Sequence, residues 1–122
     1  MTNQNKAQAA AAADYLIIPD LHEMIAGITP DSIVSRTVYQ GPTLRIIVFG
    51  FAAGQELSEH TSSKEAVLHF LSGEALVTLG KAAEGGETTH AEAGTLIRMR
   101  PGLPHTVVAQ TDTIMLLSMM GS

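Results

Sequence analysis

Residues 54–73 read GQELSEHTSSKEAVLHFLSG, and their pattern decides the fold. Gly54 opens a tight turn, because a glycine adopts turn conformations without the steric penalty of a Cβ. His60 follows after five intervening residues, and in an extended chain the side chain of Ser62 points to the same side. Residues 66–71 form a mostly apolar run of strand length, which a Ser-Gly pair closes. The stretch therefore predicts a turn, a presented histidine and a buried strand.

A second stretch has a related arrangement. Residues 94–105 read GTLIRMRPGLPH, which predicts a strand, a Pro/Gly turn and another histidine, His105.

These two stretches resemble the two signature motifs of the cupin superfamily. The first motif is Gly, five residues, His-x-His, three or four residues, Glu, six residues and Gly. The second is Gly, five residues, Pro-x-Gly, two residues, His, three residues and Asn. The residues at the expected spacings are Gly54, His60, Gly73, Gly94, Gly102 and His105. The resemblance covers about residues 44–118 and is to small single-domain bacterial cupins of the conserved-barrel type.

The chain departs from these motifs at several positions. The residues at the departing positions are Ser62 for the second histidine, Ala66 for the glutamate, Arg100 for the proline and Ala109 for the asparagine. The metal set that the resemblance implies, three histidines and one glutamate, is thus reduced to His60 and His105.

Strand-like segments with turn signals between them run through most of the chain. The expected strands are residues 32–40, 43–52, 66–71, 74–79, 89–92, 94–99, 106–110 and 113–120. Together with the resemblance, they predict an all-β double-stranded β-helix, the jelly-roll barrel of cupins. Residues 14–122 are expected to form this single domain, with a short helical or irregular segment at its start. Residues 1–13 are expected to be disordered or frayed.

Composition excludes several classes of protein. The chain has 122 residues, of which 45% are hydrophobic, so it can bury one core. A net charge of −5 and the lack of a Lys/Arg cluster argue against binding to nucleic acid. No apolar run is long enough to span a membrane, and no secretory signal is visible. The absence of cysteine excludes disulfides and thiolate ligands and fits a cytoplasmic protein.

His60 and His105 are the residues that we expect to line the barrel cavity and to bind a ligand. Neutral imidazole is a common metal ligand, so the pair could hold a divalent ion, either Zn, Fe, Ni or Mn. A metal-free pair bridged by water or by a ligand is the alternative, and the protein would then have no cofactor. Ser62 is expected to donate a hydrogen bond to a bound anion or water.

A catalytic metal needs about three protein ligands, and two residues could supply the third. Glu65 lies one residue before the expected glutamate, and His69 lies in the apolar strand. If Ala66 faces the cavity, alternation turns both outward unless a bulge changes the register. His69 would then be a histidine of the outer layer or of a dimer interface.

Other titratable residues are expected at the surface. Arg98 and Arg100 flank one methionine on the same strand, so both point to one side. They would line an anion-binding cavity if they faced inward, and be ordinary surface charges if they faced outward. His22 and His90 are expected to face solvent.

Three functions are compatible with these residues. The first is a cupin that binds a small polar or carboxylated molecule in the cavity of His60 and His105, with or without a divalent metal. The second is a metal-dependent enzyme of the dioxygenase or isomerase type, and the third is a ligand-sensing regulatory module. The residues leave open whether the protein is an enzyme. A homodimer is expected, because the apolar strands at both ends of the chain need covering.

Overall fold

The computed structural model describes residues 14–121, in which nearly all regular structure is β-strand. The strands are β1 (Ile33–Gln40), β2 (Leu44–Phe51), β3 (Glu56–His60), β4 (Glu65–Ser72), β5 (Glu74–Leu79), β6 (Glu87–Glu92), β7 (Leu96–Met99), β8 (His105–Ala109) and β9 (Thr113–Met120). Short 3-10 helices, η1 (Leu21–Met24) and η2 (Ala82–Glu84), accompany them. No helix among these residues is long and apolar enough to cross a membrane. Residues 1–13, which we expected to be disordered or frayed, lie outside the described residues.

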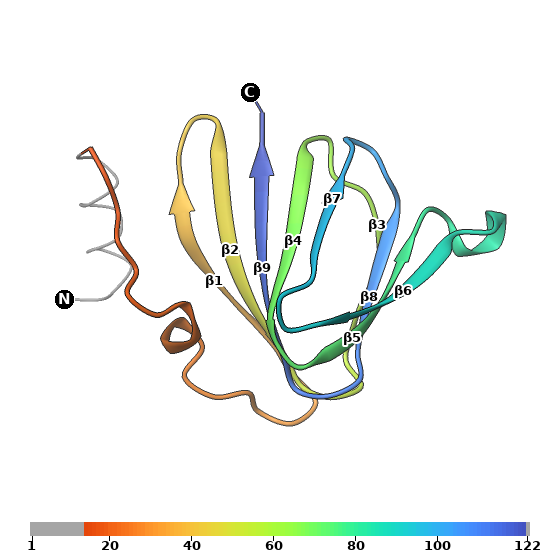
Figure 1. Cartoon of the computed structure of the whole chain (residues 1–122), viewed down its shortest axis with the longest axis horizontal. Coiled ribbons are helices and arrows are strands. Elements are labelled where there is room, and N and C mark those ends of the chain that lie inside the picture. Colours follow the sequence, from red (N-terminus) through yellow and green to blue (C-terminus); the bar gives the residue numbers. More distant parts are fainter. Residues whose placement is uncertain (1–13, 122) are drawn as a thin grey trace.

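The strands form two antiparallel sheets that face each other across one core (Figure 1). One sheet has the order β1-β2-β9-β4-β7, and the other has the order β3-β8-β5-β6. From β2 to β5 and again from β6 to β9, the chain crosses from one sheet to the other at each step. This alternation is the double-stranded β-helix, or jelly roll. The prediction of an all-β jelly-roll fold is therefore confirmed.

The core lies between the two sheets, and β4 shows how the sequence builds it. Ala66, Leu68 and Phe70 are buried, whereas the residues between them are partly exposed. This period of two is what a strand with one face on the core requires. The other buried members of this core are Phe51, Ala75, Val77, Ala91, Met99, Val107, Ala109 and Met115. Complete burial of a side chain such as Phe70 contributes about 1.5–3 kcal/mol.

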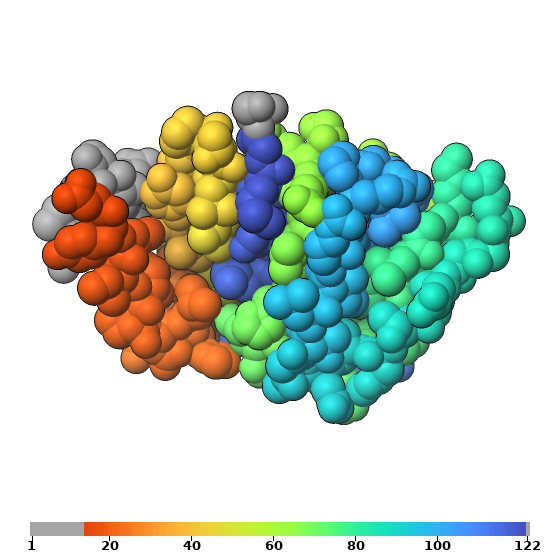
Figure 2. Space-filling model, turned by 45° about the horizontal axis from the view of Figure 1, so that its top comes forward, coloured from red at the N-terminus to blue at the C-terminus, as the bar shows by residue number. Residues whose placement is uncertain are grey.

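A second apolar cluster covers the outer face of the larger sheet. Ile25 packs there with Val38 of β1 and Val48 of β2, and further apolar residues of the N-terminal segment surround them. Figure 2 shows this segment, in orange, lying against the strands β1 and β2, in yellow. The described residues before Pro30, 14–29, therefore cover the side of the barrel and not its mouth. Part of the apolar surface that led us to expect a homodimer is thus covered within one chain.

The strand predictions were correct within one or two residues at most boundaries, and β3 was missed. We interpreted residues 54–60 as a turn that presents a histidine, whereas residues 56–60 pair with β8. The sequence ELSEH is almost wholly polar, and only Leu57 of this strand is partly buried. Because β3 has no apolar alternation, it lacks the signal by which a strand is recognised.

Candidate functional site

His60 and His105 lie side by side, although they come from distant parts of the sequence. His60 is the last residue of β3, His105 is the first residue of β8, and the two are direct cross-strand partners. Their ring centroids are 4.2 Å apart, and the ring planes are inclined by 58°. The antiparallel register between β3 and β8 thus creates a histidine pair.

The two imidazole rings are held in the same way. Nδ1 of His60 lies 2.7 Å from the carbonyl oxygen of Ser58, and Nδ1 of His105 lies 2.9 Å from that of Leu103. A carbonyl oxygen only accepts hydrogen bonds, so each Nδ1 carries the proton that it donates. In a neutral ring, the lone pair then resides on Nε2. Both histidines therefore keep Nε2 available as a hydrogen-bond acceptor or a metal ligand.

Burial favours the neutral form of His105. Its side chain is buried, with 5% of the residue exposed, whereas His60 is exposed. This burial lowers the pKa of His105 below its ordinary value, the carbonyl of Leu103 opposes the shift, and the neighbouring His60 adds to it. His105 is consequently an uncharged donor of a lone pair at neutral pH.

The histidine pair lines a cavity of about 520 Å³. The cavity lies between the turn that joins β1 to β2, the link between β3 and β4, and the end of β9. These segments meet at the end of the barrel where β9 ends and the sheets diverge (Figure 1). Ser62 and Ala66, the positions where the chain departs from the first motif, both line this cavity.

Ser62 is half-buried in the wall of the cavity. Its Oγ accepts a hydrogen bond from the backbone N–H of Lys64 at 3.2 Å and lies 3.8 Å from the sulfur of Met119. The hydroxyl is thereby held on the same wall as His60.

Glu65 and His69 do not join the histidine pair. They alternate with the buried Ala66 and Leu68 along β4, so they lie on the outer face of the sheet. Glu65 accepts a hydrogen bond from Nε of the exposed Arg98. His69 lies between its cross-strand partners in β7 and β9, Leu96 and Leu116. Neither residue is in place to be the third ligand of His60 and His105.

Arg98 and Arg100 are both exposed. Arg98 binds Glu65 on the outer surface, and Arg100 donates to the carbonyl oxygen of Pro101. The cavity lining includes neither of them. The anion-binding cavity that two inward-facing arginines would have formed is therefore not built from these residues.

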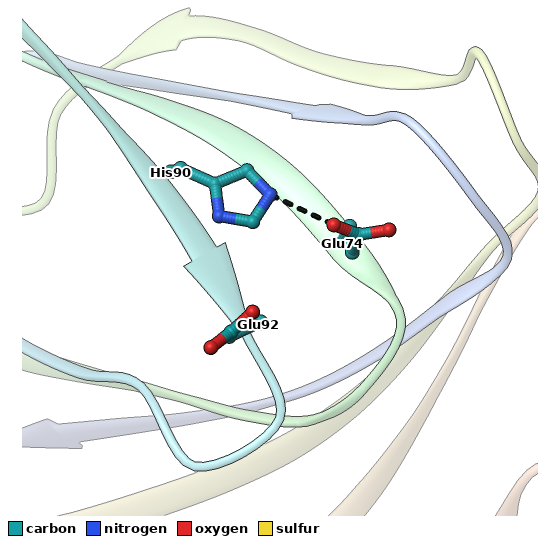
Figure 3. Close-up of side chains that lie close together, drawn as sticks. All are labelled: Glu74, His90 and Glu92. Atoms are coloured by element: carbon teal, nitrogen blue, oxygen red, sulfur yellow. Dashed lines mark hydrogen bonds and ion pairs between the residues drawn. The ribbon is translucent and has the colours of Figure 1, made fainter.

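A second group of possible ligands lies on the hairpin of β5 and β6 (Figure 3). Glu74, His90 and Glu92 place ligand atoms within 4.8 Å of one another. Glu74 is the cross-strand partner of Glu92, and His90 shares their face because it precedes Glu92 by two residues. Nε2 of His90 lies 3.0 Å from Oε1 of Glu74. A metal ion could bind here, but the group is exposed and already contains its own hydrogen bond.

Sequence reasoning found His90 only as a solvent-facing residue and missed this group. The pattern His-x-Glu places two ligands on one face of a strand, which is visible in the sequence. Glu74 joins them only through the register between β5 and β6. Aligning residues 74–79 with residues 87–92 as the two strands of a hairpin would have placed Glu74 opposite Glu92 and revealed the group.

The fold and the cavity together define a small jelly-roll barrel with a histidine pair at its mouth. A family model described as a cupin domain matches residues 47–120, which is more than half of the chain. The chain belongs to the cupin family. No curated protein sequence matches it.

Several solved structures share this fold. A conserved protein of unknown function from Streptococcus pyogenes is 32% identical, with a TM-score of 0.75 over 89% of this chain and 90% of that one. A cupin superfamily protein from Desulfitobacterium hafniense is 19% identical, with a TM-score of 0.75 over 84% of this chain and 88% of that one. The DMSP lyase of Ruegeria pomeroyi is 19% identical, with a TM-score of 0.66 over 75% of this chain and 48% of that one. At 19% identity, the last two show the fold alone.

Proposed function

We propose that this cupin binds a small molecule in the cavity of His60 and His105, and that a divalent metal ion takes part in binding. The observation that carries the proposal is the geometry of the two rings. Each ring donates its Nδ1–H to a backbone carbonyl, which leaves the Nε2 lone pair of each ring for a ligand, and the ring centroids are 4.2 Å apart. Fixing of the imidazole by a hydrogen bond at its other nitrogen is the usual arrangement around a metal-bound histidine.

The size and the lining of the cavity support a small ligand. A volume of about 520 Å³ lies within the range of about 300–1,000 Å³ that is common for ligand pockets. Apolar side chains such as Leu117 and Met119 share the wall with the hydroxyl of Ser62. Such a wall can enclose the body of a small molecule and orient it through a few polar contacts.

The donor set suits a metal that shares its coordination with a ligand. His60 and His105 would hold the ion through Nε2, and imidazole nitrogens suit Zn, Fe and Ni. The cavity wall offers no carboxylate among the residues that the structure describes. The remaining positions would therefore belong to water or to the bound molecule. When bound, the ion would act as a Lewis acid towards an oxygen of that molecule.

Metal titration by isothermal calorimetry tests this proposal. We expect Zn²⁺ to bind wild-type protein, and the His60→Ala variant to lose this binding. His60 is exposed, so its removal leaves the core intact. His90→Ala is the matched control, because it removes the histidine of the other possible metal group. Binding that survives in His60→Ala and disappears in His90→Ala would contradict the proposal.

A further inference from the structure

The wall of the cavity carries positive charge in a chain that is acidic overall. The chain has 12 acidic and 7 basic residues, and all 12 acidic residues lie within the described part. The lining includes two basic residues, Arg45 and Lys64, and none of the acidic ones. This local reversal of charge selects for a negatively charged occupant.

Arg45 stands on the inner face of the larger sheet. It alternates along β2 with Ile46, which packs against the outer cluster, and it shares its face with Phe49, which packs against the core. Its cross-strand neighbours are Gln40 on one side and Met119 on the other, and both of these line the cavity. The guanidinium therefore belongs to the row of residues at the mouth. In residues 14–121, no carboxylate forms an ion pair with it.

Lys64 lies just before β4, which flanks β9 in the same sheet on the side away from β2 and Arg45. Its Nζ donates a hydrogen bond to the carbonyl oxygen of Gly121, at 3.0 Å. This bond ties the ammonium to the end of the chain beside the cavity, and two of its three protons remain for other acceptors.

The acidic residues that lie nearest to Lys64 in the sequence are turned away from the cavity. Glu65 binds Arg98 on the outer face of the sheet. Glu59 accepts a hydrogen bond from the backbone N–H of Ala82, at 3.3 Å. Among residues 14–121, the charges of Arg45 and Lys64 thus have no acidic partner.

The geometry points to a small organic anion as the ligand of this cavity. Its negatively charged group lies between Arg45 and Lys64, within reach of the hydroxyl of Ser62 and of the histidine pair. This inference rests on the proposed function, because it names the class of molecule that the same cavity binds. A carboxylate or a phosphate fits equally, since both accept hydrogen bonds from a guanidinium and an ammonium.

Calorimetric titration with matched probes tests the inference. Malonate carries the charge, malonamide has nearly the same shape without it, and inorganic phosphate represents the other anion. We expect malonate or phosphate to bind and malonamide to bind at least about tenfold more weakly, the equivalent of one charge-assisted hydrogen bond. The affinity should fall as salt is added. Whichever anion binds more tightly identifies the charged group.

The variants locate the anion. Arg45→Gln and Lys64→Gln should each weaken anion binding by about tenfold, the size of one charge-assisted hydrogen bond. Lys81→Gln, in the exposed loop between β5 and β6, is the matched control and should bind as wild type does. Thermal unfolding of each variant confirms that it is folded.

Failure of this inference is distinguishable from failure of the proposed function. Equal binding of malonate and malonamide that depends on His60 would overturn the anionic ligand and leave the cavity as a binding site. Equal losses in Arg45→Gln and Lys81→Gln would also overturn it. Loss of Zn²⁺ binding in His90→Ala alone contradicts the proposed metal site, whatever the anions do.

Discussion

Gly73→Ala should destabilise the fold and leave the binding cavity unchanged. Gly73 joins β4 to β5 with a φ of +85°. This connection lies at the opposite end of the barrel from the link between β3 and β4 that follows His60 (Figure 1). A Cβ at this position would overlap the carbonyl oxygen of Asp112 and would lie 2.6 Å from Oγ1 of Thr113. Thr113 cannot easily move aside, because it is fully buried and its hydroxyl lies 2.8 Å from the carbonyl oxygen of Thr111.

Two costs add up at Gly73. A left-handed backbone costs a residue with a Cβ about 1–2 kcal/mol. Overpacking against fixed neighbours costs about 1–3 kcal/mol more. The free energy of unfolding should therefore fall by about 2–5 kcal/mol. Gly54→Ala is the matched control, because φ is +87° there but a Cβ would meet nothing within 4 Å. Only the first cost, about 1–2 kcal/mol, applies to Gly54.

Urea denaturation of the two variants measures this difference, and thermal unfolding provides a second reading. At about 4 °C for each kcal/mol, Tm should fall by about 8–20 °C in Gly73→Ala and by about 4–8 °C in Gly54→Ala. Zn²⁺ binding of the folded protein should be unchanged in both. Equal losses of stability would refute the steric part of the reasoning. Loss of Zn²⁺ binding in folded Gly73→Ala would refute the claim that Gly73 affects the stability of the fold without affecting the binding site.

The other predictions concern the metal, the pH and the core. Ser62→His adds an imidazole to the cavity wall. It should raise the Zn²⁺ affinity measured by calorimetry by at least about tenfold, because removing even a residue that hydrogen-bonds to a metal ligand lowers metal affinity by about 10–100-fold. Lys81→His, on the exposed loop, should leave the Zn²⁺ affinity unchanged. Burial lowers the pKa of His105, so below pH about 6.5 the unfolded chain binds a proton that the folded chain does not, and stability falls on acidification. Urea unfolding across this pH range should show that the free energy of unfolding of wild type falls with decreasing pH, and that it falls less steeply in His105→Asn. Equal pH dependence in the two proteins would contradict a lowered pKa of His105. Phe70→Ala should lower the free energy of unfolding in urea by about 3–5 kcal/mol, because Phe70 is fully buried. Leu96→Ala should lower it little, because Leu96 is 62% exposed. Similar losses in the two variants would show that Phe70 does not belong to the core.

The architecture was predictable because its signals are local. Turn glycines such as Gly73 and apolar runs such as residues 66–71 mark the ends and the interiors of strands. The spacing of His60 and His105 within the two motifs supplied the family. The polar strand β3 was not predicted, because it is held in the sheet by its pairing with β8 and its sequence has no hydrophobic alternation.

The candidate site was only partly predictable, because its polar groups are assembled by register. Arg45 stands in the strand TLRIIVFGFA, where nothing in the sequence tells whether its end of the strand lies at an open mouth. Glu74 and His90 are brought together by the pairing of β5 with β6. The protonation of Nδ1 in His60 depends on a carbonyl that only the folded chain brings into place. The spacing of residues within the motifs predicts neither the position of Arg45 at the mouth, nor the contact of Glu74 with His90, nor the protonation of His60.

A crystal of the wild-type protein soaked in Zn²⁺ would show directly whether the histidine pair is a binding site. Anomalous scattering locates the ion without reference to any ligand. We expect a peak in the cavity at about 2.0–2.1 Å from Nε2 of both His60 and His105, the usual distance between zinc and an imidazole nitrogen. An empty cavity, with zinc only at Glu74, His90 and Glu92, would contradict the metal site proposed for the pair.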